Sequence, residues 1–234
     1  MKKFALSFEM RYQYAYNYQL RSPPMDTANE KPDFNLDTDV KYPSDYAGQK
    51  LFVQASDWQN NAMLGWMHFP LGLYACGYKE AADGLLFAIE HRKVSLDSVI
   101  YPLVFLYRQG LELQLKLILP LARRLANKPA KADHDHRLMP LWAELRTLLN
   151  ELTPHPDDKE LPALEEIIQQ LDEVDPQSFA FRYPATKKGE VSLPNIRHIN
   201  VRHLGEVMDS AFMLMDGIHG ELGAMDQYEE HGEW

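Results

Sequence analysis

The first twenty residues alternate between apolar and polar positions. Apolar and aromatic side chains fall on one parity from Phe4 to Leu20, with mostly small or polar residues between them. A period of two is typical of an extended strand and not of a helix. At about 3.3 Å per residue the run would measure roughly 55 Å, so we expect a bend or more than one pairing partner. The expected second strand is 50–55, with Leu51 and Val53 on one side, and the alternative partner is the same strand of a second copy.

The pattern becomes helical after Asp57. Residues 21–49 are rich in proline and acidic residues and hold few aliphatic ones, so we expect an irregular arm there. Apolar residues then recur at helical spacing to about Arg92, and Pro70 is expected to kink or split this segment. Further helices are expected over 98–127, 138–152 and 161–174, and from Asn200, a favoured N-cap residue, to about 222.

The segment 98–127 is apolar on nearly every side, which places it at the centre of a helical bundle. Its polar exceptions, Arg108, Glu112 and Lys116, are spaced four residues apart, so they form one stripe and can pair along the helix. We expect a helix-stabilising ladder, with the alternative that the stripe lines a functional cleft. The predicted fold is mainly α, with a β-type N-terminal extension over 1–56, an up-and-down helical bundle over 57–223 and an acidic, mobile tail over 224–234.

Charge is distributed unevenly along the chain. The formal net charge of −10 opposes nonspecific binding of nucleic acid. Five basic residues and one acid nevertheless lie between Arg182 and His203, whereas eight acids and no Lys or Arg lie between Glu206 and Trp234. A polyanion should therefore bind the segment 182–203.

Cysteine content and hydropathy predict a cytoplasmic protein. The single Cys76 allows neither an intramolecular disulfide nor zinc-finger spacing, which fits a reducing compartment. The apolar run at 4–8 is too short for a signal peptide, and charged residues interrupt the most apolar stretch, 99–119, so no membrane span is expected. The cluster 134–136 (HDH) suggests metal ligands, but the spacing places no further ligand, and we predict neither a metal site nor another cofactor.

Motifs in the helical part resemble those of the HEPN superfamily. Residues 107–116 read YRQGLELQLK, residues 136–138 read HRL, and FRYP occupies 181–184 before the last helix. HEPN proteins have a central helix of the form Q-x-x-E-x-x-L-K, a following His-x-Leu helix and an Arg-Tyr-Pro turn. The likeness covers roughly 57–222 and implies a HEPN-like bundle, whereas 1–56 has no counterpart.

The resemblance also implies a catalytic pair. Catalytic HEPN proteins carry an Arg followed, four to six residues later, by a His at the start of the last helix, and Arg197 and His203 fit this pattern. His203 would then move a proton to or from the 2′-hydroxyl or the leaving oxygen, and Arg197 would stabilise charge on the phosphate. An Arg and a His at this spacing are expected by chance in a chain of this composition. The match at Arg197 and His203 is informative because it lies at the predicted start of the last helix, inside the basic segment. Further contacts to the substrate are expected from Arg182, Lys187, Lys188, His198 and Arg202.

Two functions of different classes follow. The first is a metal-independent endoribonuclease of the toxin or defence type, acting on RNA as a homodimer and regulated by a protein partner such as an antitoxin. The second is a catalytically silent module that binds RNA, a nucleotide or a protein partner. A fold does not decide between them.

Overall fold

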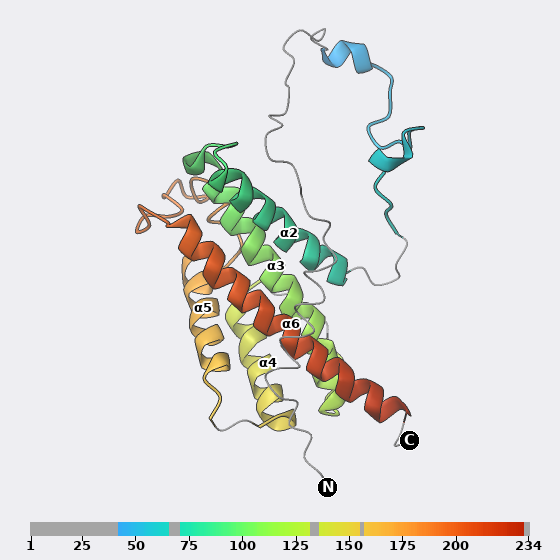
Figure 1. Cartoon of the computed structure of the whole chain (residues 1–234). Coiled ribbons are helices and arrows are strands. Elements are labelled where there is room, and N and C mark those ends of the chain that lie inside the picture. The colour runs from blue at the N-terminus through green and yellow to red at the C-terminus, as the bar shows by residue number, and fades with distance from the viewer. Residues whose placement is uncertain (1–41, 66–70, 132–135, 155–156, 232–234) are drawn as a thin grey trace. The chain divides into compact units, whose positions relative to one another are not determined.

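The computed structural model describes residues 42–65, 71–131, 136–154 and 157–231, and the chain forms two units, one of them spanning residues 20–68. The other unit contains five α-helices (Figure 1), namely α2 (Leu71–Glu90), α3 (Leu96–Leu125), α4 (Leu138–Leu152), α5 (Glu160–Val174) and α6 (Val201–His231). No strand occurs in the described parts of the chain, which are mainly α-helical as predicted. The aromatic run at 4–20 lies outside them.

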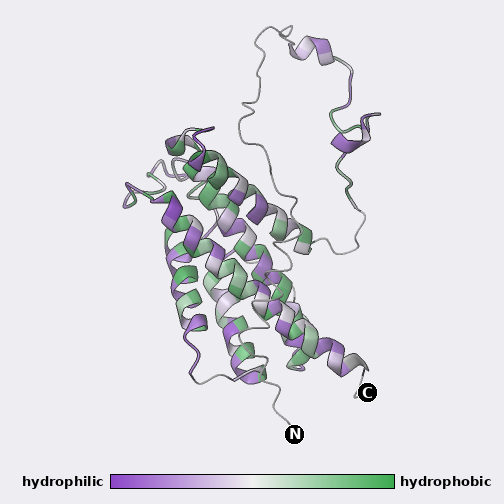
Figure 2. Cartoon of the chain, in the orientation of Figure 1, coloured by the Kyte–Doolittle hydropathy of each residue, from purple (hydrophilic) through white to green (hydrophobic). Residues whose placement is uncertain are grey.

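Helix α3 is central and contacts α2, α4 and α6. Its side chains Leu111, Leu115 and Ile118 are completely buried, which confirms the expectation from its all-round apolar surface. The other helices have one apolar side and one polar side, and Figure 2 shows hydrophobic (green) and hydrophilic (purple) residues on each of them. At Gly110, α3 lies so close to α6 that an added Cβ would be 3.0 Å from the Phe212 ring.

Side-chain contacts give the directions of the helices. Residue numbers rise together from α3 to α4, in the pair Arg123–Glu144 and, just after α3 ends, in Lys128–Glu151. They also rise together along α3 and α6, in the pairs Gln114–Asp216 and Arg124–Asp226. They run in opposite senses for α2 against α3 and for α4 against α5, in the pairs Gly72–Leu117, Asp83–Tyr107, Leu138–Asp172 and Trp142–Glu165. Helices α3, α4 and α6 therefore run one way, and α2 and α5 run the other way.

The predicted up-and-down order is thus wrong between α3 and α4. The connection 126–137 can span roughly 40 Å when extended. This exceeds the rise of α3 between Arg108 and Leu125, roughly 26 Å, so the chain can return along α3 before α4 begins. The guanidinium Nη1 of Arg123 donates to the carbonyl oxygen of Lys131 at 3.0 Å and holds the start of this connection against α3.

Two predictions for the segment before the bundle are wrong. Residues 50–55 form no strand, and Leu51 is 85% exposed. The expected helix from Asp57 is reduced over 57–65 to a 3-10 turn at Trp58–Asn60, with Trp58 77% exposed. An isolated helix needs a packing partner for its apolar side, and here Asn61 bonds instead to the backbone N–H and carbonyl of Ala55, at 2.8 Å each.

Helix α6 continues further than predicted. We expected its last apolar turn near 222 and a mobile tail after it, yet the chain is helical to His231. The reason lies in tertiary contacts, because Met225 packs against the core and Asp226 forms an ion pair with Arg124. Within the described residues, no helix has the length and apolar character needed to cross a membrane.

Candidate functional site

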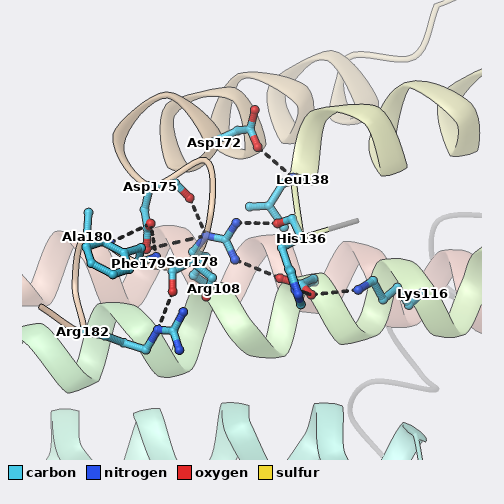
Figure 3. A network of polar contacts seen from close by, with 11 residues as sticks. Arg108, Lys116, His136, Leu138, Asp172, Asp175, Ser178, Phe179, Ala180 and Arg182 are labelled. Atoms are coloured by element: carbon cyan, nitrogen blue, oxygen red, sulfur yellow. Dashed lines mark hydrogen bonds and ion pairs between the residues drawn. The ribbon is translucent and has the colours of Figure 1, made fainter. Parts of the chain in front are cut away.

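The predicted stripe on α3 is the start of a buried polar network (Figure 3). The guanidinium of Arg108 donates from Nη1 to Glu112 Oε2 at 2.9 Å, from Nη2 to the carbonyl of His136 at 2.7 Å, and from Nε to the carbonyl of Asp175 at 2.9 Å. The Arg108 side chain is 0% exposed. One side chain therefore joins α3 to the residues before α4 and to the turn after α5.

Glu112 holds the other end of this network. Its Oε1 accepts from Lys116 Nζ at 2.9 Å and lies 3.0 Å from His136 Nδ1. Burial opposes ionisation of Glu112, but the bonds from Lys116, His136 and Arg108 outweigh it and hold the pKa of this carboxyl below its ordinary value. The predicted pairing along the helix is confirmed, but Glu112 is 1% exposed and Lys116 only 14% exposed, so the ladder is internal.

Asp175 fixes the turn that follows α5. Its Oδ1 accepts the backbone N–H groups of Phe179, at 2.5 Å, and Ala180, at 2.9 Å. Ser178 has a φ of 55°, in the left-handed region, and it turns the chain so that Phe181 is buried while Arg182 is exposed. The buried network therefore fixes the point at which the predicted basic segment begins.

Lys187 and Lys188 lie at the tip of a small hairpin. An antiparallel bridge joins Ala185 to Val191, and the Thr186 N–H donates to the Glu190 carbonyl at 2.8 Å. Both lysine side chains are exposed. The hairpin therefore holds two of the predicted substrate-binding cations in solvent.

The remaining predicted site residues surround the N-terminus of α6. Asn200 is its N-cap, as predicted, because its Oδ1 accepts the His203 N–H at 3.1 Å. Within the described residues, no hydrogen bond or ion pair involves the side chains of four exposed residues here, Arg197, His198, Arg202 and His203. The structure thus brings Arg197 and His203 to one end of one helix, where unpaired backbone N–H groups and the helix dipole also favour an anion.

A second charged cluster, between α2, α3 and α6, was not predicted. Lys79 Nζ contacts Asp83 at 2.6 Å and Asp209 at 3.0 Å, and these carboxylates raise the pKa of Lys79 although burial acts to lower it. The Tyr107 hydroxyl donates to Asp83 at 3.0 Å, and burial together with the Asp83 charge raises the Tyr107 pKa. Only the spacing of four between Lys79 and Asp83 carries a sequence signal.

Asp216 lies further along α6. Gln114 Nε2 donates to its Oδ1, and burial raises the Asp216 pKa to about 6. Burial also lowers the pKa of His219. Among the residues that the structure describes, no group of three or more His, Cys, Asp or Glu could hold a metal ion, and residues 134 and 135 of the predicted alternative lie outside them.

The chain matches no protein family model, no curated protein and no solved structure.

Proposed function

We propose that the protein binds RNA through the basic segment, residues 182–203, and cleaves it without a metal ion at Arg197 and His203. The observation that carries the proposal is the set of exposed cations around the start of α6, which have no acidic partner among the described residues. In a chain of net charge −10, local cations without partners are available to phosphates. The resemblance to HEPN proteins supports the choice of RNA and of this pair.

The chemistry needs only proton transfer and charge stabilisation. The 2′-oxygen attacks phosphorus while the bond from phosphorus to the 5′-oxygen breaks, giving a 2′,3′-cyclic phosphate and a 5′-hydroxyl. His203 takes the 2′-hydroxyl proton or gives a proton to the 5′-oxygen, and water performs the other transfer. The Arg197 guanidinium would stabilise the additional charge on the phosphate oxygens.

A specific observation favours the second function, RNA binding without cleavage. A catalytic histidine is usually oriented by a hydrogen bond to its second ring nitrogen. Neither the His203 ring nor the Arg197 guanidinium has such a partner among the described residues. As part of the proposal, a second copy of the chain would have to supply one, and the mass of the protein in solution tests for this homodimer. A regulatory partner of the antitoxin type would instead cover the exposed residues and block cleavage.

Incubation of end-labelled RNA with the protein in EDTA tests the proposal. We expect cleavage that leaves 2′,3′-cyclic phosphate ends, and a loss of at least about 100-fold in Arg197→Ala and in His203→Ala. Lys159→Ala is the matched control, because Lys159 is an exposed cation at the start of α5, at the end of the bundle away from the start of α6. Full activity in either site variant would remove the proposed pair, and RNA binding without cleavage by the wild type would establish the second function.

A further inference from the structure

Two aromatic rings lie at the start of the basic segment. The rings of Phe179 and Tyr183 are stacked, with centroids 4.7 Å apart and an angle of 28° between their planes. The guanidinium carbon of Arg182 lies 5.7 Å from the centre of the Tyr183 ring and 5.5 Å from that of Phe105. Tyr183 is nevertheless 50% exposed. Phe179, Arg182 and Tyr183 therefore form an aromatic platform that is partly open to solvent.

The platform is held rigidly by the backbone beneath it. The N–H groups of Arg182 and Tyr183 donate to the Phe179 carbonyl at 3.0 and 3.2 Å, and Arg182 Nε donates to the Ser178 carbonyl. Figure 3 shows this turn joined through Asp175 to the buried Arg108. A surface whose geometry is fixed before a ligand arrives loses little conformational entropy on binding.

Positively charged side chains follow the platform along the chain. With Nε bonded to Ser178, the terminal nitrogens of Arg182 are available, since no hydrogen bond to them occurs within the described residues. The Pro184 carbonyl accepts the Ser192 N–H at 3.0 Å and closes the hairpin that carries Lys187 and Lys188. An aromatic surface followed by cations is the arrangement that binds the bases and the backbone of a single strand.

We propose that the aromatic platform binds an unpaired base of single-stranded RNA, with the base stacked on Tyr183 and its phosphate held by Arg182. The inference rests on the RNA-binding function proposed above and specifies the class of RNA. In a duplex both faces of each base are covered by its neighbours, so a stacking surface selects single-stranded segments. Lys187 and Lys188 would contact the next phosphates.

Equilibrium binding of three labelled probes of equal length tests the platform, namely a single-stranded RNA, the same RNA as a duplex and an abasic single strand. We expect Tyr183→Ala to weaken binding of the single-stranded RNA by about 5- to 150-fold, the range that loss of one stacked base produces. Tyr183→Phe keeps the ring and should bind as the wild type does. The abasic strand should bind wild type and Tyr183→Ala equally, and the duplex should bind more weakly than the single strand.

Failure of the platform and failure of the proposed function give different results. If Tyr183→Ala retains its melting temperature and binds single-stranded RNA as tightly as the wild type does, the platform is excluded while RNA binding stands. If the wild type binds none of the three probes at low salt, both proposals fall. Arg182→Ala should reduce the salt dependence of binding, whereas Tyr183→Ala should leave it unchanged, because only the first removes a phosphate contact.

Discussion

Two regions of this protein contain the same kinds of side chain in opposite environments. On α3, Arg108 and Lys116 both donate to the Glu112 carboxylate. The other two hydrogen bonds of the Arg108 guanidinium go to the carbonyls of His136 and Asp175, so its charge is satisfied within the protein. At the start of α6, the side chains of Arg197 and His203 are exposed and form no hydrogen bond or ion pair within the described residues. A buried cation whose bonds are satisfied internally stabilises the fold, whereas an exposed cation without an acid can bind a ligand.

Burial changes the free energy of stabilisation expected from the Arg108–Glu112–Lys116 ladder on α3. An exposed pair of this spacing stabilises a helix by about 0.2–0.5 kcal/mol. Removal of one member of a buried pair costs about 3–5 kcal/mol, because the other charge is left buried without its partner. The same four-residue spacing thus has two very different energetic consequences, depending on burial.

The largest effect is expected from Arg108→Ala. The substitution leaves Glu112 Oε2 and the carbonyls of His136 and Asp175 without the Arg108 donors, so we expect the free energy of unfolding to fall by about 3–5 kcal/mol. Urea unfolding followed by circular dichroism measures it. Arg146→Ala is the control, since Arg146 is 3.9 Å from Asp158 and should lose less than about 1 kcal/mol. Equal losses in the two variants would contradict the assignment.

Acid should destabilise the buried network on α3 through Glu112. The Glu112 pKa is lowered in the folded protein, so its contribution to stability is present above the unfolded value of about 4.3 and is lost as the pH falls through the folded value. Glu112→Gln should therefore be less stable at pH 7, and its stability should fall less steeply below about pH 4. Unfolding free energies measured from pH 2 to 7 test this. An acid limb as steep as that of the wild type would show that other carboxyls dominate.

At Asp216 we expect a smaller effect on stability, with the opposite dependence on pH. Its pKa is raised to about 6 in the folded protein, so the folded state binds the proton more tightly than the unfolded state does. Its contribution to stability is largest at low pH and declines as the pH rises from about 4 to about 6. Asp216→Asn should remove this decline and make the protein more stable at pH 7. The gain should be less than about 1 kcal/mol, because Asp216 is solvent-exposed and water screens its charge. A loss of stability at pH 7 would contradict the raised pKa.

The sequence predicted the helices best where local pattern and tertiary packing agree. The bounds of α4 and α5 follow from their apolar periodicity and flanking prolines, and Asn200 marked the start of α6. The end of α6 depends on Asp226 and Arg124, which are 102 residues apart, and no local pattern contains that contact. The helix expected after Asp57 failed for the converse reason, because its pattern was helical but Trp58 is 77% exposed among the described residues of its own unit.

In the candidate site too, local spacing predicted some features, and tertiary contacts determined the others. Spacing along one helix predicted the pairing of Arg108 with Glu112, but their burial depends on His136 and Asp175, which lie 28 and 67 residues from Arg108. Composition placed the cations in 182–203, while their freedom from acidic partners depends on how the hairpin and α6 are arranged. In the sequence Tyr183 is distinguished only by its place in the FRYP motif, since a stacked and exposed ring cannot be recognised without the turn that holds it.

The salt dependence of RNA affinity tests the central claim most directly, namely that the cations around α6 are free to bind phosphates. For single-stranded RNA, each lost phosphate contact should reduce the slope of log K against log salt concentration by about 0.7. We predict that the double variant Arg197→Ala, Arg202→Ala lowers the slope by about 1.4, while Lys159→Ala leaves it unchanged. A slope in the double variant equal to that of the wild type would contradict the account.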